Sequence, residues 1–202
     1  MGDQKFPRKT YSTPRHPWEK NRIDTERKIL EEFGLVNKRE LWKSQSLLQN
    51  FRAQAMDLQA RLRTENPSAK KQFDLLIRKL SRYNILGEGA SLDDILSLNL
   101  ENVLSRRLQT VVYKKGLSGT VKQARQLITH GHILLNGRRV TIPGMLVERQ
   151  YEDTIRFNPD SPVSDEDHPL RRAFEKPAEA QEEAKEEKNE QAAPVEESAP
   201  IE

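Results

Sequence analysis

The sequence GLSGTVKQARQLITHGHILLNGRRV, residues 116–140, predicts a helix, a short strand and a tight turn in succession. Thr120 is a candidate N-cap, because its side-chain oxygen can accept a hydrogen bond from the first turn of a helix. Gly131 would end that helix, since glycine readily adopts the left-handed conformation. Residues 133–135 are apolar, and Asn136-Gly137 is the dipeptide typical of a two-residue hairpin. A helix followed by a β-hairpin is therefore expected.

The predicted helix has one apolar face and one polar face. The apolar side chains recur at helical spacing and are Val121, Ala124, Leu127 and Ile128. The polar side chains lie at i, i+3, i+4 and i+7 and are Lys122, Arg125, Gln126 and Thr129. We expect the first face to pack into a core and the second to meet solvent or a ligand.

The helix and hairpin lie in a segment without negative charge. Between Asn102 and Val147 there is no Asp or Glu, although the chain's own acidic frequency predicts about seven carboxylates there. The segment has eight basic residues: Arg106, Arg107, Lys114, Lys115, Lys122, Arg125, Arg138 and Arg139. A carboxylate beside a phosphate costs Coulomb energy, so the exclusion of acids indicates a polyanionic partner.

The start of the helix at Thr120 would suit a phosphate group. Free backbone N–H groups and the positive end of the helix dipole meet there, with Lys122 and Arg125 within one turn. Other polar side chains that could add contacts are Gln123, Gln126, His130, His132 and Asn136. Contacts of this kind position a nucleic acid without reading its sequence.

The overall composition bounds the class of protein. The chain has 202 residues, of which 35% are hydrophobic and 32% charged, so the apolar residues must be concentrated to form a core. It has no cysteine, which excludes disulfides and Cys-ligated zinc and favours an intracellular protein. The N-terminal residues lack the apolar region of a signal peptide. No apolar run approaches the ~20 residues that span a bilayer, so no membrane partner is expected.

The charge is divided between a basic body and an acidic tail. Residues 175–202 hold ten Glu and three Lys, a net charge of −7, which leaves +10 for residues 1–174. This asymmetry indicates nucleic-acid contact by the body. The alternative is a solvated surface with a solubilising tail. The tail has almost no apolar side chains and is expected to be disordered.

Residues 1–22 are expected to form an extended basic arm. Its cationic candidates for RNA contact are Arg8, Lys9, Arg15 and His16. Tyr11 and Trp18 are interleaved with them, and aromatic rings among cations can stack on exposed bases. The favoured interpretation of a lone tryptophan is different, namely that Trp18 anchors the arm to the core.

The remaining pattern predicts an α+β fold. Residues 23–33 form a helix, Asn37 caps a longer one with a continuous apolar stripe, Ser68 begins a third, and Ser91 caps a short fourth at 92–96. Residues 102–113 predict a further helix before the one at Thr120. Strands are expected at 133–135, 138–142, 145–147 and 154–157.

The expected organisation has four parts. These are the arm at 1–22, a helical subdomain at 23–100, two helices on a small twisted antiparallel sheet at 101–160, and a Pro- and charge-rich extension with the acidic tail at 161–202.

The sequence offers no catalytic or metal-binding pattern. His130 and His132 lie on either side of Gly131, but no further ligand is near in sequence to complete the usual set of four. GLSG at 116–119 lacks the Lys-Ser/Thr of a phosphate-binding loop. No nucleophile with a base can be argued. We expect no catalytic residue, no metal and no cofactor.

Residues 116–140, with Arg107-Leu108 on the preceding predicted helix, resemble the S-four RNA-binding domain. The matching motifs are Arg107-Leu108, Ala-Arg-Gln-Leu-Ile at 124–128, Gly131, and Leu-Asn-Gly at 135–137. Gln109 stands where that domain often has an acid. The resemblance implies two helices on a twisted sheet that binds structured RNA.

The flanking segments narrow the resemblance to one family. TPRHPWEKNRI at 13–23, NKRELWKSQSLL at 37–48 and RRLQTVVYKKGL at 106–117 are similar to the archaeal-type S-four family of small-subunit ribosomal proteins, over about residues 5–175. The resemblance implies a cytoplasmic ribosomal protein that binds ribosomal RNA and nucleates assembly of the subunit body. The Cys-rich zinc site of bacterial members is not carried over, because the chain has no cysteine.

The same resemblance implies two further partners and a role in decoding. Members lie beside ribosomal protein S five and other small-subunit proteins, near the channel where messenger RNA enters, and affect translational accuracy. Lys38, Arg39 and Lys43 are the candidates for messenger contact. An RNA-modifying enzyme and a stress-response binder of ribosomes are the alternatives that use the same domain. The enzyme would need a catalytic domain, and only 45 residues follow Phe157.

Overall fold

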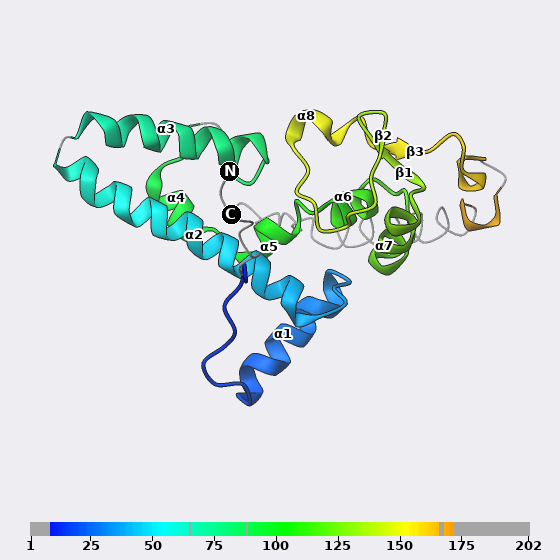
Figure 1. Ribbon diagram of the computed structural model, residues 1–202, viewed down its shortest axis with the longest axis horizontal. Coiled ribbons are helices and arrows are strands. Elements are labelled where there is room, and N and C mark those ends of the chain that lie inside the picture. Colours follow the sequence, from blue (N-terminus) through cyan, green and yellow to red (C-terminus); the bar gives the residue numbers. More distant parts are fainter. Residues whose placement is uncertain (1–8, 65, 88, 166–167, 172–202) are drawn as a thin grey trace, which may run out of the picture.

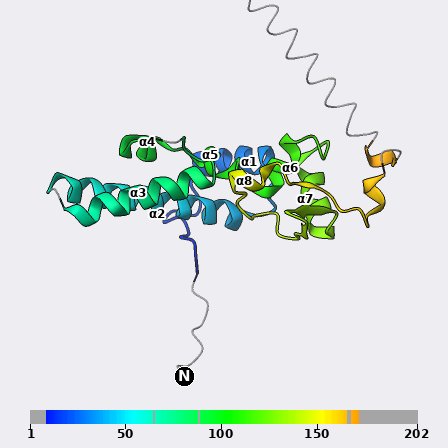
Figure 2. The same cartoon turned by 90° about the horizontal axis from the view of Figure 1, so that it is seen from above.

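The computed structural model describes residues 9–64, 66–87, 89–165 and 168–171. A helical lobe and a smaller mixed lobe follow one another along the long axis of the molecule in both views (Figures 1 and 2). The acidic tail expected to be disordered lies outside the described residues. Within the described residues, no helix is long and apolar enough to cross a membrane.

The helical lobe is built on α2 (Lys38–Arg63), which packs against α1 (Lys20–Glu32), α3 (Pro67–Arg82), α4 (Leu92–Ser97) and α5 (Leu100–Leu104). Asn37 caps α2 as predicted, because its side chain accepts a hydrogen bond from the Glu40 N–H at 3.1 Å. The predicted stripe on α2 is buried against α3 and α4, with Leu48, Phe51, Ala55 and Leu58 in one apolar cluster.

One helix of this lobe begins at a different residue from the one predicted. α3 begins at Pro67, one residue before the predicted start, because Asn66 is its N-cap and accepts from the Ser68 N–H at 3.0 Å. Proline suits the first helical position, where no intrahelical bond is lost. Ser91 caps α4 as predicted and forms a reciprocal capping box with Asp94.

The mixed lobe contains α6 (Leu108–Lys114) and α7 (Val121–His130), which pack on a three-stranded antiparallel sheet of order β2-β1-β3. The strands are β1 (Ile133–Leu135), β2 (Arg138–Arg139) and β3 (Arg156–Phe157). Asn136 and Gly137 both have positive φ, 50° and 72°, as a primed hairpin turn requires. The predicted helix, strand and hairpin are confirmed, and so is the α+β fold class.

The core of this lobe forms where the predicted apolar faces meet. Ala124, Leu127 and Ile128 of α7 join the buried side chains of α6 and β1 in a single cluster. The lobe is completed by α8 (Arg149–Glu152) and by the 3-10 helix η1 (Pro162–Ser164), whose Val163 reaches the same cluster.

The single helix predicted at 102–113 is wrong. The chain forms α5 and α6 instead, and Arg107 between them is extended, with φ −71° and ψ 142°. No side chain caps α6. Its first two N–H groups donate to backbone carbonyls, Leu108 to Met145 at 2.7 Å and Gln109 to Pro143 at 3.2 Å. These bonds satisfy donors that a helix start leaves free.

The strand predicted at 145–147 is also wrong, because those residues are used in capping α6. They make only an isolated bridge between Leu146 and Arg107, and Val147 donates to the Arg106 carbonyl at 2.9 Å. β2 ends at Arg139 and β3 begins at Arg156, so both strands are shorter than predicted.

Candidate nucleic-acid interface

The exposed face of α7 presents the polar residues that the sequence predicted. Lys122, Gln126, Thr129 and His130 are exposed, while the opposite side of the helix is buried. Thr120 caps the helix, and its hydroxyl accepts from the Gln123 N–H at 3.2 Å. The helix start is therefore ordered by its own cap, and the exposed Lys122 follows it directly.

The β-hairpin extends this face beyond the end of α7. Arg139 of β2 donates from Nη2 to the His130 carbonyl at 3.3 Å, so its guanidinium lies beside the last turn of α7. A Cβ on Gly131 would lie 2.0 Å from the Nε of Arg139, which shows how closely the guanidinium covers this glycine. Arg138 is exposed as well. Arg139 thus links the hairpin to the α7 face that carries Lys122 and His130, and Arg138 is a second exposed cation of the same hairpin.

Two lysines stand at the end of α6. Lys114 is exposed, and Lys115 is half-buried with its Nζ 3.6 Å from a carboxylate oxygen of Asp153. The Asp153 side chain is fully solvated, so this pair is weak. Gly116 follows with a φ of +72° and ends the helix as predicted.

Arg106 and Arg107 do not extend the exposed basic surface. They are 9% and 5% exposed, so the prediction that they extend the exposed basic patch is wrong. Arg106 donates to the Tyr83 carbonyl at 2.8 Å and to Glu152 at 2.7 Å. Arg107 donates to Glu40 at 2.6 Å. The two neighbours lie in the short connection between α5 and α6, where Arg106 is in a turn and Arg107 is extended, and they contact different elements.

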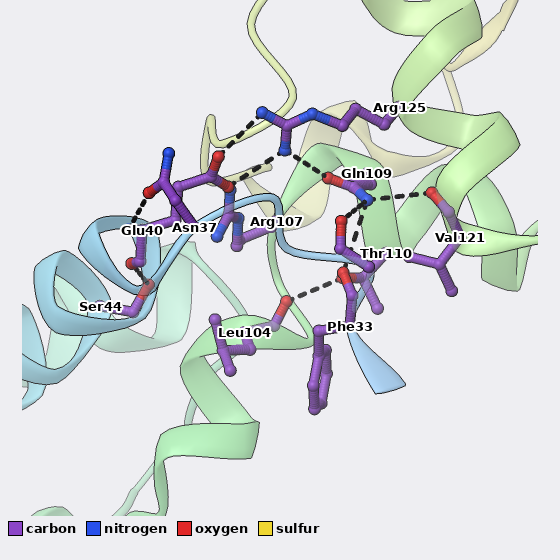
Figure 3. A network of polar contacts seen from close by, with 11 residues as sticks. Phe33, Asn37, Glu40, Ser44, Leu104, Arg107, Gln109, Thr110, Val121 and Arg125 are labelled. Atoms are coloured by element: carbon purple, nitrogen blue, oxygen red, sulfur yellow. Dashed lines mark hydrogen bonds and ion pairs between the residues drawn. The ribbon is translucent and has the colours of Figure 1, made fainter. Parts of the chain in front are cut away.

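Arg125 is also held inside the molecule, as Figure 3 shows. Its guanidinium binds both carboxylate oxygens of Glu40, Nη2 to Oε1 at 2.8 Å and Nη1 to Oε2 at 3.1 Å. Glu40 therefore joins α2 to both α6 and α7. Arg125 is half-buried with its charge already paired, so it is not part of the exposed cationic face on which Lys122 lies.

The pKa of Glu40 lies below its ordinary value. Burial alone would raise the pKa, but hydrogen bonds from Arg125 and Arg107, with their charges, outweigh it. The side chain of Glu40 is thus charged at neutral pH and complements two guanidinium groups.

Gln109 lies at the centre of the same junction and is buried. Its Nε2 donates to the Gly34 carbonyl at 3.0 Å and to the Val121 carbonyl at 2.9 Å. A carboxylate at this position could not donate to carbonyl oxygens. No signal in the sequence indicates this role of Gln109, or that of Glu40, whose partners are 67 and 85 residues away along the chain.

The two histidines around Gly131 face other polar groups. Their rings stack with centroids 6.1 Å apart, and His132 Nδ1 lies 2.7 Å from the Ser161 hydroxyl. Burial, together with the charges of His130 and Arg139, lowers the pKa of His132. A hollow of about 280 Å³ beside them is lined by Gln123, Gln126, Leu127, His130, His132, Val163 and Leu170. Across the described residues, no group of three or more potential metal ligands occurs.

The described part of the arm, residues 9–19, rests on α1 and α2. Lys9 lies over the ring of Tyr11 at 4.7 Å, and Tyr11 stacks on Trp42 at 6.0 Å. Arg15 and His16 are exposed. Arg8 lies outside the described residues.

Trp18 does not anchor the arm. It is 91% exposed, so the interpretation of this residue as a core plug is wrong. Trp42 holds the arm instead, a role that its sequence context did not reveal.

The three candidates for messenger contact divide into two kinds. Lys38 is half-buried, with its Nζ 3.0 Å from Glu26. Arg39 and Lys43 are exposed and lie one turn apart on α2. The two exposed side chains therefore remain open to a ligand.

Two protein families match consecutive parts of the chain. Residues 5–105 match the family described as Ribosomal protein S4/S9 N-terminal domain, and residues 106–153 match the S4 domain. The boundary between the two matches falls at the connection between α5 and α6, just before Arg106 and Arg107.

Archaeal proteins named small ribosomal subunit protein uS4 are similar over most of the chain. The protein of Picrophilus torridus is 65% identical over 171 residues, which cover 85% of this chain and 93% of that protein. The protein of Thermoplasma acidophilum is 58% identical over 186 residues, covering 92% and 94%. The protein of Methanococcus maripaludis is 50% identical over 174 residues, covering 86% and 96%.

These identities confirm the resemblance of the three flanking motifs and of the helix–hairpin segment. Proteins of this kind are structural components of the ribosome. The two alternatives, an RNA-modifying enzyme and a stress-response binder, have no support from these relatives. The chain therefore belongs to the uS4 family of small ribosomal subunit proteins, carries an S4 RNA-binding domain, and is a structural ribosomal protein and not an enzyme.

Proposed function

We propose that this protein binds small-subunit ribosomal RNA directly through the exposed face of α7 and the adjoining β-hairpin. The observation that carries the proposal is the contact of Arg139 with the end of α7, which joins the exposed cations of the hairpin to the helix face that carries Lys122 and His130. Because the segment between Asn102 and Val147 has no acidic residue, a phosphate backbone can approach this face without meeting a carboxylate of that segment.

The chemistry of this face suits the RNA backbone. Lys122, Arg138 and Arg139, with Lys114 at the end of α6, supply positive charge. Thr120, Gln126 and Asn136 are exposed and supply neutral hydrogen-bonding groups. Such groups position RNA by its phosphates and 2′-hydroxyls, so the protein would recognise shape more than sequence.

The internally paired arginines support this function indirectly. Arg107 and Arg125 hold α6 and α7 against α2 through Glu40, so the α7 face is fixed relative to the helical lobe. A binding surface that is ordered in advance loses less entropy on binding. We infer that the arm at 1–22 shares RNA contact with the domain at 101–160, and that Lys9, Arg15 and His16 contribute to it.

In the small subunit, we infer that the protein nucleates assembly of the subunit body and lies in the cytoplasmic ribosome near the channel where messenger RNA enters. Arg39 and Lys43 are the side chains available for messenger contact, since both are exposed. Ribosomal protein S five would be a neighbour there. Through these contacts the protein would affect translational accuracy.

The RNA face can be tested by charge reversal. The double variant Lys122→Glu with Arg138→Glu removes two cations without touching a paired arginine. We expect weaker binding to small-subunit ribosomal RNA, and a log–log salt slope that is shallower by roughly 0.7–0.9 for each phosphate that is no longer neutralised. Titrations at several salt concentrations measure both quantities.

The matched control reverses two exposed lysines on α3, Lys70→Glu with Lys71→Glu, and changes the net charge equally. If the control loses as much affinity as the test variant, the effect is one of overall charge and the assignment of the α7 face fails. Normal binding by the test variant would also contradict the assignment.

The messenger contacts need a separate measurement. Arg39→Gln with Lys43→Gln should reduce the ability of reconstituted small subunits to open a base-paired messenger, because two cations facing the strand are removed. Subunits with Lys70→Gln and Lys71→Gln serve as the control. Unchanged opening and unchanged miscoding would exclude this placement.

A further inference from the structure

Trp18 is the largest exposed apolar side chain in the described part of the chain. Its side chain is 91% exposed, whereas the second tryptophan, Trp42, is half-buried and donates from Nε1 to Glu26 at 3.2 Å. Tryptophan has a large flat ring that strongly favours contact with another surface. A binding partner is therefore expected to cover the exposed ring of Trp18.

The backbone that carries Trp18 is held in place. Arg22 donates from Nη2 to the carbonyls of His16 and Pro17, both at 3.0 Å. On the N-terminal side of Trp18, Pro14 and Pro17 have a restricted φ. On its C-terminal side, α1 begins two residues later, at Lys20. The indole thus projects from a fixed turn between the arm and α1.

Arg22 is itself fixed by a buried carboxylate. Its Nη1 donates to Glu26 at 2.6 Å, and Glu26 also accepts from Trp42 and from Lys38. Burial alone would raise the pKa of Glu26, but these hydrogen bonds lower it. The charged Glu26 therefore connects α1, α2 and the turn that carries Trp18 before any ligand is present.

The charges around Trp18 favour a polyanion. Arg15, His16 and Lys20 are exposed on the neighbouring positions. Glu19 is the adjacent acid, and its carboxylate lies 3.8 Å from Arg22 Nε, so its charge is partly balanced. A flat apolar ring among exposed cations matches an unpaired base, which has an apolar face and flanking phosphates.

We propose that Trp18 is a stacking platform for an unpaired base of the ribosomal RNA, presented by the Arg22–Glu26 contacts. The inference rests on the proposed RNA-binding function and deepens it. The α7 face would position the RNA by its phosphates, and Trp18 would hold one base that is not part of a helix.

The first test compares binding of Trp18→Ala, Trp18→Phe and the unaltered chain to protein-free small-subunit ribosomal RNA transcribed from the Thermoplasma acidophilum sequence. Loss of a stacked base lowers affinity roughly 5- to 100-fold. The phenylalanine variant keeps most of the affinity. The salt slope stays the same in all three, because stacking displaces no counterion. Leu75→Ala removes another exposed apolar side chain (63% exposed) and serves as the matched control.

The second test uses fluorescence. Trp42→Phe leaves Trp18 as the only tryptophan, and its emission should be quenched when the RNA binds. In Trp18→Phe, the remaining Trp42 is already stacked on Tyr11 and its emission should change little.

The outcomes separate this inference from the function on which it rests. Equal affinity of Trp18→Ala and the unaltered chain for the RNA, or no quenching of Trp18, overturns the inference alone. If Trp18→Ala binds protein-free RNA normally but is poorly incorporated into subunits, Trp18 fits a pocket on another protein. That outcome also overturns the inference. If the unaltered chain does not bind the RNA, the proposed function fails and the inference fails with it.

Discussion

At the scale of single residues, Glu40 is the residue on which the junction between the two lobes depends. One carboxylate binds two guanidinium groups from different parts of the mixed lobe, and the Arg107 side chain is almost fully buried. Leaving such a charge without its partner is costly, since neither water nor another acid can replace the carboxylate.

We therefore predict that Glu40→Gln lowers the free energy of unfolding by about 2 kcal/mol or more. Urea unfolding followed by circular dichroism measures the change. Glu31→Gln is the matched control, because Glu31 pairs with Arg27 on the surface, where both side chains are solvated. The control should change stability by less than about 1 kcal/mol. Equal effects of the two variants would show that the Glu40 junction adds nothing.

The same residue predicts a dependence of stability on pH. Both Glu26 and Glu40 have a folded-state pKa below the ordinary value of 4.5. The folded chain thus binds fewer protons than the unfolded chain in this range. Their stabilisation is complete above pH 4.5 and is lost as the pH falls through the lowered folded-state pKa values. Urea midpoints measured from pH 6 to pH 3 should decrease, and the decrease should be smaller in Glu40→Gln. An identical profile in the variant would contradict the assignment.

Residue roles were the part of the molecule least accessible from the sequence. Lys122 and Arg125 look alike in a linear pattern, yet one is exposed and the other is bound to Glu40. A helical period shows that two side chains lie on one face, but it does not show which of them meets an acid from a distant helix. The exposure of Trp18 could not be predicted for the same reason. The sequence around a tryptophan does not show whether another aromatic ring already anchors the segment.

At the scale of elements, Gly131 at the end of α7 is required for two separate structural reasons. Gly131 has a φ of +79°, and the Arg139 guanidinium lies where a Cβ would be. Local signals at this helix were sufficient to predict it from sequence, since the Thr120 cap, the apolar period and Gly131 all lie within twelve residues.

We predict that Gly131→Ala destabilises the protein by more than Gly116→Ala. Both glycines end a helix with positive φ, which costs an alanine about 1 kcal/mol. At Gly116 no atom lies within 4 Å of the added carbon, so that variant reports backbone strain alone. The excess at Gly131, read from thermal unfolding, reports the displacement of Arg139. It should shrink when Arg139→Ala is added, and an unchanged difference would refute the contact.

The break between α5 and α6 could not be predicted in this way. Residues 102–113 have an apolar period that suits one helix, and only the return of residues 143–147 gives the start of α6 its acceptors. A capping partner some 36 residues away leaves no local signal. The same tertiary contact explains why the strand expected at 145–147 does not form. Backbone groups that cap a helix cannot also form a sheet ladder.

At the scale of the whole molecule, three apolar clusters lie in sequence along the long axis. One lies within the helical lobe and one within the mixed lobe. The third, with Phe33, Leu35, Leu41 and Leu104, lies where α1, α2 and α5 meet. The mixed lobe, which carries the proposed RNA-binding face, and the turn before α1, which carries the proposed platform, therefore belong to separate parts of one connected framework (Figure 1).

Charge at this scale leads to a prediction about the C-terminal residues. Residues 175–202 carry a net charge of −7 beside a body of +10, so an acidic segment competes with RNA for basic side chains. Deleting residues 176–202 should leave the affinity for small-subunit RNA unchanged or raise it, most clearly at low salt. Filter binding at two salt concentrations tests this, and a clear loss of affinity would contradict it.

The Glu40 junction also sets an order of events during synthesis. Glu40 is made 67 residues before Arg107 and 85 residues before Arg125, so α2 is synthesised while this carboxylate has no partner. Chain segments are produced at roughly 5–20 residues per second, which leaves Glu40 unpaired for several seconds. Docking of the two lobes through Glu40 therefore cannot precede translation of Arg125, so a newly made chain reaches its RNA-binding geometry only after α7 has been translated.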